Sequence, residues 1–480
     1  MKEKFAPSLP EPSRMVHALS QIGYKLENAI ADLIDNSITA GASSVLIRFL
    51  HDGNRLVSLA IADDGHGMTE RGLSDAMRFG SAEDHSKGGL GKFGMGLKLA
   101  SLSHSDEFSV FTRRNGRNSG KRWTIENLAS GWLLETLDSK VTKPVFENNW
   151  ADLDLGKNGT VVLWDRLRGF PQHKKGIKSG LSLIERRLRL HLGLTFHRFI
   201  EDGRVHIKMD QQEINRRTRP FFVEIEPLNP FGYEVSGSER FPVRMRTPAI
   251  DGIGHLEFDA HIWPSKSEEK EYRLGKRAAS HQGFYVYRNG RLIQAGGWNG
   301  LVHDDSEPHS SLARVCLDLE PKLDEFFGLN VQKSAVITPI GFQDAVKASE
   351  SECGLSWEDY RKASISAYRQ SSEVFSQPVP GKGFPRKLQQ AYKTENGNEV
   401  KLSVSESQAD PVEVDLNSRT IRVSSQLRNV GMSKATDSSW HAFTILLFET
   451  FSTAFARDSL SKLAEQKLHA LNKSLSYLEE

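Results

Sequence analysis

The stretch Leu26–Ala42 constrains this chain most strongly, because it combines a helical pattern with two polar side chains one turn apart. Asp32 and Asn36 lie on one side of the predicted helix, away from Leu33. The amide oxygen could bind Mg²⁺, and the carboxylate could orient or deprotonate a water that attacks a phosphoryl group. The same segment also fits a plain helix with a solvated face. The apolar residues that recur at helical spacing and predict a buried stripe are Leu26, Ala29, Ile30, Leu33 and Ile34.

Composition excludes several classes of protein. With 480 residues, the chain is expected to hold roughly two to four domains of about 100–200 residues. A net charge of +2 gives no global field for nucleic acid, so any basic surface must be local. The two cysteines, Cys316 and Cys353, exclude a disulfide framework, and no Cys/His spacing indicates zinc. No apolar run approaches the ~20 residues of a membrane helix, and Met1–Arg14 lacks a signal-peptide core. We therefore expect a cytoplasmic protein.

The order of predicted elements indicates an α+β architecture in the first part of the chain. Prolines among the first dozen residues predict an extended arm over residues 1–14. After the helix that begins at Leu26, alternating apolar residues predict strands at 45–49 and 56–62, and a later strand is predicted at 160–164. Helices combined with antiparallel-looking strands favour a layered α+β domain, which we expect to span residues 15–218.

A second unit is expected over residues 219–372. Its predicted strands lie at 221–225, 255–263, 284–287 and 313–319, and Arg288-Asn289-Gly290-Arg291 between apolar runs predicts a hairpin. A helical segment from Ile340 to about residue 371 would close this unit. A Pro/Gly-rich linker is predicted over 373–388. Residues 389–480, of unknown role, are expected to form a small α+β region that ends in a long helical stretch from about residue 439 to 478.

A second polar signal, Asp63-Asp64-Gly65-His66-Gly67-Met68, leaves the predicted strand at 56–62. Asp63 would be held at the strand end, where its carboxylate can accept a hydrogen bond from an exocyclic amine such as that of adenine. Gly65 and Gly67 let the backbone approach a flat ring closely. Further along the chain, Thr160 of Asn158-Gly159-Thr160 enters a strand beside this expected base pocket.

A glycine-rich loop, Gly88–Ser101, lies between these two signals and runs into an apolar helix. Its free amides and the N-terminus of that helix can hold phosphates, and Lys92 would add a positive charge. Each of the four signals is common by itself, since glycine runs are mostly turns. Their occurrence in this order is far more specific than any one of them.

The four signals resemble the Bergerat-fold ATP site of the GHKL family, which includes gyrase B, topoisomerase VI, MutL, the ninety-kilodalton heat-shock chaperones, histidine kinases and MORC proteins. The resemblance implies a Bergerat-fold α/β sandwich that binds ATP with Mg²⁺. By motif, Asn36 is the Mg²⁺ ligand, Asp63 binds adenine, and Phe79-Gly80-Ser81 resembles the start of a mobile lid. The implied ATP-binding residues are Asn36, Asp63, Gly65, Gly67, Met68, Ser81, Gly89, Leu90, Gly91, Lys92, Phe93, Gly94, Met95, Gly96, Leu97, Thr160, Gln332 and Lys333.

One position departs from the family pattern. Many relatives carry Glu as the general base four residues before the Asn, whereas this chain has Asp32. The loss of one methylene moves the carboxylate by about 1.5 Å, and a displacement of about 1 Å can cost ~10²-fold in rate. We therefore expect an ATPase with a low rate, in which Asp32 is the catalytic base and Glu27 or Asp35 are the nearby alternatives.

The second unit resembles the ribosomal-protein-like transducer domain of gyrase-type members. Its segment Leu323–Ser334 resembles the loop that reaches the nucleotide, so Gln332 and Lys333 would lie at ATP, with Lys333 on the γ-phosphate as a second catalytic residue. The same lysine also fits an ordinary exposed polar loop. The segment Gly283–Ile293, followed by Gly297-Trp298, is most similar to MORC proteins and their bacterial relatives. The likeness covers about residues 15–370.

The MORC resemblance implies an ATP-dependent homodimeric clamp on double-stranded DNA, without sequence specificity, and bacterial relatives suggest defence against foreign DNA. The alternative is a nucleotide-gated protein-binding or chaperone-like module with little hydrolysis, with a protein partner on the C-terminal region. Salt-sensitive binding to duplex DNA, stronger with ATP, would separate the two hypotheses. Local basic clusters could face DNA or simply be solvated: Arg113, Arg114, Arg117, Lys121 and Arg122; Lys174, Lys175 and Lys178; Arg186, Arg187 and Arg189; Arg216, Arg217 and Arg219; Lys276 and Arg277.

Overall fold

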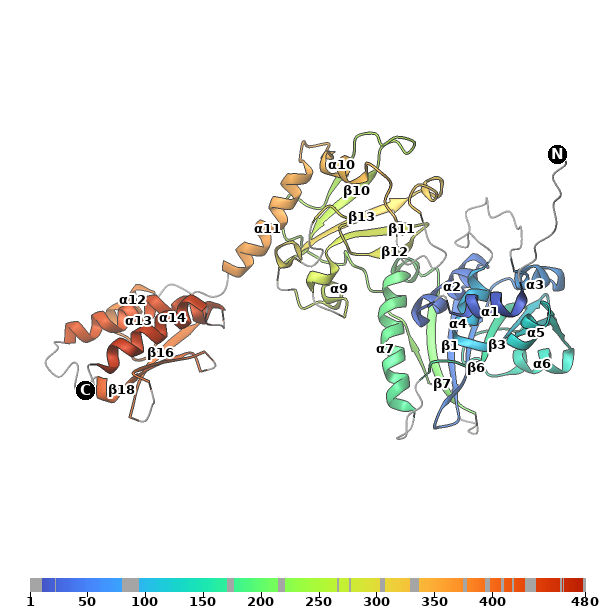
Figure 1. Ribbon diagram of the computed structural model, residues 1–480, viewed down its shortest axis with the longest axis horizontal. Coiled ribbons are helices and arrows are strands. Elements are labelled where there is room, and N and C mark those ends of the chain that lie inside the picture. Colours follow the sequence, from blue (N-terminus) through green and yellow to red (C-terminus); the bar gives the residue numbers. More distant parts are fainter. Residues whose placement is uncertain are drawn as a thin grey trace, which may run out of the picture. The chain divides into compact units, whose positions relative to one another are not determined.

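The chain divides into two compact units, residues 1–367 and 368–480, which are described separately (Figure 1). The boundaries predicted from sequence remain predictions. Helix α1 begins at Pro12, inside the segment predicted as an arm. The structure is a computed structural model that describes residues 11–21, 23–79, 95–170, 177–214, 221–265, 267–275, 278–302, 307–328, 336–373, 378–392, 398–406, 410–416, 418–427, 437–457, 460 and 462–477.

The first unit contains an eight-stranded sheet in the order β5-β4-β3-β6-β2-β1-β7-β8. Paired strands are antiparallel, except that β1 and β7 are parallel. The strands are β1 (Ser44–His51), β2 (Leu56–Asp63), β3 (Ser105–Arg114), β4 (Arg117–Thr124), β5 (Glu135–Leu137), β6 (Gly159–Leu167), β7 (His206–Glu213) and β8 (Phe222–Glu224). The helices are α1 (Pro12–Ser20), α2 (Leu26–Thr39), α3 (Glu70–Met77), α4 (Gly96–His104), α5 (Ile125–Ala129), α6 (Ser139–Glu147), α7 (Lys178–Thr195) and α8 (His197–Glu201).

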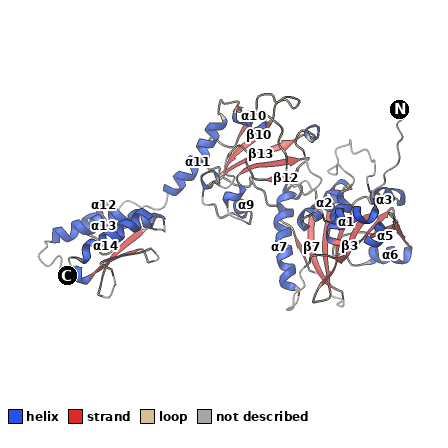
Figure 2. Cartoon of the chain, viewed as in Figure 1, coloured by secondary structure: helices blue, strands red, loops and turns tan. Residues whose placement is uncertain are grey.

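Alternation along β1 places its side chains in two different cores, one on each face of the sheet. Val45, Ile47 and Phe49 pack in the larger core, together with apolar residues of α2, α4 and α7. Leu46 packs instead in a smaller core with Phe146 of α6. Because residues two apart share a face of a strand, one strand can serve both cores. The sheet is therefore covered by helices on both faces (Figure 2), and the predicted α+β class is confirmed.

A buried ion pair joins β1 to β7 in the smaller core, on the face of the sheet opposite α2. Arg48 donates from Nε and Nη2 to the two carboxylate oxygens of Asp210, at 2.8 and 2.6 Å. Both side chains have 0% exposure, and the guanidinium lies 4.9 Å from the ring centroid of Trp150. Two-pronged pairing of this kind fixes the register between the two parallel strands.

The same unit contains a second sheet of six strands, in the order β12-β11-β13-β10-β9-β14. The predicted hairpin at Arg288–Arg291 is confirmed, since β11 pairs with β12 across this turn. The helical segment predicted from Ile340 is interrupted by β14, which pairs with β9. The elements are β9 (Val243–Arg246), β10 (Glu257–Ile262), β11 (Gly283–Arg288), β12 (Arg291–Ala295), β13 (Ala313–Leu319), β14 (Glu350–Ser351), α9 (Lys270–Arg273), α10 (Phe342–Lys347) and α11 (Trp357–Glu373).

Helices α7 and α8 connect the two sheets of the first unit. Leu190 and Leu194 of α7 pack against a cluster on the second sheet that includes Leu292 of β12. Polar contacts from α8 accompany this packing: His197 Nε2 lies 2.9 Å from the hydroxyl of Tyr287. Arg198 and Asp318 also form an ion pair, with Nη1 at 2.6 Å from Oδ1. The second sheet is thus held against α7 by apolar contacts and against α8 by polar and charged contacts.

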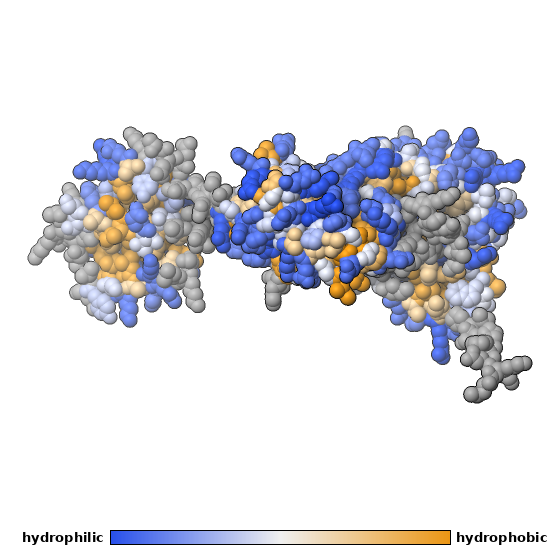
Figure 3. All heavy atoms as spheres, turned by 90° about the horizontal axis from the view of Figure 1, so that it is seen from above, coloured by the Kyte–Doolittle hydropathy of each residue, from blue (hydrophilic) through white to orange (hydrophobic). Residues whose placement is uncertain are grey.

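Within its described residues, the C-terminal unit contains a four-stranded sheet in the order β15-β16-β18-β17, together with helices. The long helical stretch predicted from residue 439 is two helices, and these share a core with the strands. Figure 3 shows hydrophobic residues on one face of this unit. Among the described residues, no helix has both the length and the hydropathy that a bilayer crossing requires. The elements are β15 (Val379–Pro380), β16 (Glu399–Ser405), β17 (Val412–Asp415), β18 (Thr420–Ser424), α12 (Arg386–Ala391), α13 (Asp437–Arg457) and α14 (Lys462–Ser476).

Candidate functional site

Helix α2 presents its polar residues in two different environments. Asp32, Asp35 and Ser37 are buried, with exposed fractions of 3, 0 and 3%. Asn36 is exposed, so its amide can meet a ligand from solvent. An exposed amide oxygen suits Mg²⁺, which is usually held by one or two protein groups together with water and phosphate oxygens. Asn36 therefore fits its predicted role as the metal ligand.

Asp63 and Thr160 meet at the end of the sheet where β2 stops. The two residues are direct partners in the β2–β6 ladder, and both are buried. Asp63 accepts hydrogen bonds on both oxygens, from the Ser37 hydroxyl at 2.9 Å and from the Gly65 amide at 3.0 Å. Burial raises the pKa of Asp63 to about 6, although these two donors oppose the shift. The structure thus brings together the residues that the sequence assigned to a base pocket.

The glycines after Asp63 are required by close backbone contacts. Gly67 has a φ of +64°, and a Cβ at this position would lie 2.0 Å from the Arg113 carbonyl oxygen. A Cβ on Gly65 would lie 2.9 Å from Cβ of Ala40, on the C-terminal side of α2. The next residue, Met68, donates its amide to Thr112 Oγ1 at 2.7 Å. No larger residue fits these turns without displacing backbone. The glycines therefore allow residues 65–68 to pack closely against the sheet.

The N-terminus of α4 faces Asp32. A Cβ on Gly96, the first residue of α4, would lie 3.7 Å from Asp32 Oδ2. Free amides and the helix dipole make such a terminus favourable for phosphate. Met95 precedes this helix, and it packs with Leu97 against the larger core. The buried carboxylate and the predicted phosphate site are therefore neighbours.

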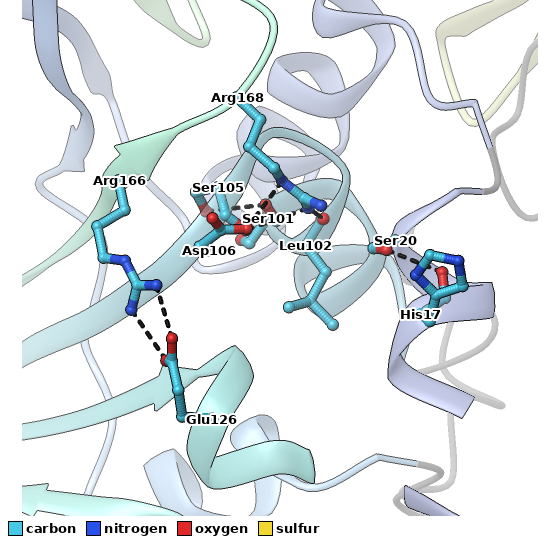
Figure 4. Close-up of polar contacts among 9 residues, drawn as sticks. All are labelled: His17, Ser20, Ser101, Leu102, Ser105, Asp106, Glu126, Arg166 and Arg168. Atoms are coloured by element: carbon cyan, nitrogen blue, oxygen red, sulfur yellow. Dashed lines mark hydrogen bonds and ion pairs between the residues drawn. The ribbon is translucent and has the colours of Figure 1, made fainter. Parts of the chain in front are cut away.

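The other end of α4 is fixed by Arg168, which follows β6 (Figure 4). Its Nη2 donates to the Leu102 carbonyl and, at 3.3 Å, to the Ser105 carbonyl, while Nε lies 3.0 Å from Asp106 Oδ1. A cation at a helix C-terminus satisfies free carbonyls and complements the dipole. This contact positions the helix whose opposite end faces Asp32.

Several predicted site residues lie outside the described residues, so their placement is not part of this geometry. They are Ser81, Gly89, Leu90, Gly91, Lys92, Phe93, Gly94, Gln332 and Lys333.

Three site residues were not identified from the sequence. Tyr24 precedes α2, and its hydroxyl donates to Asp32 Oδ2. Ser37 follows Asn36 directly and binds Asp63. Arg291, in the predicted hairpin, reaches back to α2, with Nε at 2.9 Å from Asp35 Oδ1 and Nη2 at 3.4 Å from Asp32 Oδ1. Adjacency to Asn36 was a usable signal for Ser37, whereas no local pattern marks the contact of Arg291 with a helix so distant in sequence.

Comparison with known proteins supports an ATP site. Residues 24–156 match the family model described as Histidine kinase-, DNA gyrase B-, and HSP90-like ATPase. Protein MICRORCHIDIA 6 of Arabidopsis thaliana is 26% identical over 123 residues, which are 25% of this chain and 18% of that protein. MORC family CW-type zinc finger protein 1 of Homo sapiens is 33% identical over 104 residues, 21% of this chain and 10% of that protein.

The DNA mismatch repair protein MutL of Endomicrobium trichonymphae is 29% identical over 103 residues, which are 20% of this chain and 17% of that protein. The matched segments thus span less than a fifth of each of these three relatives. Residues 24–156 are therefore similar to ATPase domains of the histidine kinase, DNA gyrase B and HSP90-like type, and about a hundred residues of this chain are similar to parts of MORC and MutL proteins.

Proposed function

We propose that this protein binds ATP with Mg²⁺ and hydrolyses it slowly to ADP and phosphate. The observation that carries the proposal is that one helix, α2, contacts both the predicted base pocket and the helix terminus predicted to face phosphate. Ser37 binds Asp63 at the base end, and Asp32 faces the N-terminus of α4 at the phosphate end. Asn36 lies between these two positions on the same helix and is exposed. In this arrangement Asp63 would accept a hydrogen bond from the adenine amine, and Asn36 would hold the metal.

Asp32 is the group that we assign to water activation. Its carboxylate is buried, and it would accept a proton from a water that attacks the γ-phosphate. Bound Mg²⁺ would offset negative charge on the phosphates. The Tyr24 hydroxyl and Arg291 both donate to Asp32, which orients its carboxylate. The shorter side chain of Asp, compared with the Glu of many relatives, supports a low rate of turnover.

The affinity for ATP should depend on pH through Asp63, whose pKa burial raises to about 6. The adenine amine favours the ionised carboxylate, so binding displaces a proton when the pH lies below 6. We expect the Kd for ATP to rise as the pH falls from 7, by approximately tenfold per pH unit below 6. Isothermal titration calorimetry from pH 5 to 8 measures this. The Asp63→Asn variant controls for titration of the triphosphate, and an equal slope in both proteins would contradict the assignment.

We further propose that ATP closes the protein into a two-fold dimer that acts as a clamp. The support is that a second sheet is docked on the ATPase domain by α7, and that the loop bearing Lys333 belongs to the segment carrying this sheet. A lysine on the γ-phosphate would distinguish ATP from ADP, because ADP lacks that charge. An ionic contact of this kind contributes about 1.5–3 kcal/mol, a shift of roughly 10–150-fold.

Light scattering should show a doubled mass with a non-hydrolysable ATP analogue, but the monomer mass without nucleotide and with ADP. Lys333→Ala should bind ATP nearly normally while losing this increase in mass and much of its turnover. Removal of residues 1–12 should have a similar effect. A single mass under all three nucleotide conditions would rule out the clamp.

The partner that we propose for the clamp is double-stranded DNA, and helix α7 offers the basic face. Arg186 and Arg189 of α7 are exposed, although Arg187 pairs with Glu27 at 2.5 Å. In the cluster 113–122, by contrast, three of the five basic residues have internal partners: Arg113 binds Asn118, Lys121 binds Thr136 and Arg122 binds Glu107. By analogy with bacterial MORC-like proteins, we place this DNA action in defence against foreign DNA.

Duplex DNA should bind more tightly with the ATP analogue, and the affinity should fall steeply between 50 and 200 mM salt, as phosphate contacts require. Replacing both Arg186 and Arg189 by Glu should weaken binding and reduce the salt slope by about 2, approximately 1 per lost phosphate contact. The matched control replaces the exposed Arg114 and Arg117 by Glu and should retain most of the affinity. Fluorescence anisotropy measures all three proteins. Salt-insensitive or absent DNA binding would favour the nucleotide-gated protein-binding module instead.

A further inference from the structure

Two carboxylates are buried side by side on α2. Asp32 and Asp35 lie three residues apart, and therefore on the same side of the helix, with exposed fractions of 3 and 0%. Two ionised carboxylates repel each other in a buried site, and each is costly to bury without a positive partner. The arrangement requires a cation held close to both side chains.

Arg291 supplies this cation from the second sheet of the same unit. It is the first residue of β12, and only 2% of it is exposed. Its Nε donates to Asp35 Oδ1 at 2.9 Å, and its Nη2 lies 3.4 Å from Asp32 Oδ1. Of these two contacts, the one to Asp35 is the shorter.

Asp32 is held from its other side by Tyr24, whose hydroxyl donates to Oδ2. The two oxygens of the carboxylate therefore receive donors from two directions, which fixes the carboxylate plane. Oδ2 is also the oxygen that faces Gly96 at the start of α4. These two donors therefore orient the Asp32 carboxylate.

We propose that Arg291 is a positioning residue for Asp32, so that hydrolysis requires the second sheet to be docked on α7. The inference rests on the proposed function, in which Asp32 is the base. The packing of the second sheet on α7 fixes the position of Arg291, because the adjacent Leu292 packs against Leu190 and Leu194. Displacement of the sheet would withdraw the cation from both carboxylates, and a misplacement of about 1 Å is enough to cost ~10²-fold in rate.

The charged and titratable groups facing this network come from several elements. Tyr24, Asp35 and Arg291 contact or adjoin Asp32. His191 of α7 interacts electrostatically with Arg291 and with Lys25, which precedes α2. Burial lowers the pKa of His191 to about 4, so its imidazole stays neutral above pH 5. The guanidinium of Arg291 is therefore the cation that contacts both carboxylates.

The test measures kcat, KM and the pH profile of kcat for ATP hydrolysis. Arg291→Met by itself leaves two buried carboxylates and could prevent folding, so the main variant is Arg291→Met combined with Asp35→Asn. This pair removes one positive and one negative charge, so their effects on the charge state of Asp32 offset each other. We expect kcat to fall at least tenfold and KM to change less than threefold, while the acid limb of the kcat profile stays within about half a pH unit of its wild-type position. Arg291→Lys in the otherwise native protein should restore part of kcat.

The matched control is Arg48→Met with Asp210→Asn, which removes another buried Arg–Asp pair on the opposite face of the first sheet. Its kcat per folded protein and its acid limb should equal those of the wild type. An unchanged kcat in the Arg291→Met/Asp35→Asn variant would overturn the inference. Asp32→Asn in the same assay separates the two proposals, because full turnover there would contradict the base assignment itself.

Discussion

Replacing Asp63 by Asn is expected to weaken ATP binding by about 100-fold or more, with the fold preserved. Both carboxylate oxygens already accept protein hydrogen bonds, from Ser37 and from the Gly65 amide. An Asn side chain must therefore turn its NH₂ group toward the Gly65 amide or toward the adenine amine, and either arrangement opposes two donors. Loss of a charged hydrogen bond together with an unsatisfied donor costs about 3 kcal/mol or more, and 1.4 kcal/mol corresponds to a factor of ten in Kd.

Isothermal titration calorimetry at pH 7.5 gives the Kd, and a thermal unfolding curve verifies that the variant is folded. Because burial of an ionised carboxylate opposes folding, Asp63→Asn should be at least as stable as the wild type without ligand. GTP provides the second measurement, since guanine presents a carbonyl where adenine presents the amine. Equal affinities of the wild-type protein for ATP and GTP would place the base pocket elsewhere.

The second large effect is expected from Asp32→Asn, which should lower kcat by ~10²–10⁴-fold while ATP binding stays within a few-fold of normal. This range is the usual contribution of a general base. Asn has nearly the same shape as Asp but cannot take a proton from water, and Arg291 keeps its bond to Asp35 in the variant. A coupled assay for ADP release gives kcat, and calorimetry gives the affinity in parallel.

Asp32→Glu is the companion variant, because it returns the carboxylate to the length found in many relatives. It should keep the rate or raise it. If turnover is unchanged in Asp32→Asn, the base lies elsewhere on α2. Asp35 is then disfavoured as the base, because it is fully buried and paired with Arg291. Glu27 would be the remaining candidate among those considered, although it is paired with Arg187.

The features predicted well from sequence depend on local patterns. The spacing of apolar residues predicted α2, and alternation predicted β1 and β2. The turn residues Asn289 and Gly290 both adopt positive φ, at +50° and +81°, as a tight hairpin turn requires. The pairing of Asp63 with Thr160 was also within reach, because both residues stand at strand ends in a recognisable order of motifs.

The features missed depend on contacts between distant segments. Arg291 follows a turn, where an arginine is normally solvated. Only 2% of its surface is exposed, however, because its side chain packs against α2. Lys121 was counted among residues of a basic surface, but it is buried and binds Thr136. The helix predicted from Ile340 stops early because Glu350 and Ser351 pair with β9. Sequence periodicity carries no information about partners that only the tertiary fold supplies.

The shared position of α7 has a practical consequence for dissecting the protein. A fragment that ends after β7 would include all of residues 24–156 but would uncover Leu190 and Leu194, which the second sheet normally covers. The same cut would remove the guanidinium that lies between Asp32 and Asp35. Such a fragment would expose an apolar stripe on α7, which promotes self-association. It would also leave two buried carboxylates without the Arg291 guanidinium, which promotes local unfolding. Fragments for biochemical work should therefore be cut after the second sheet, and never between it and α7.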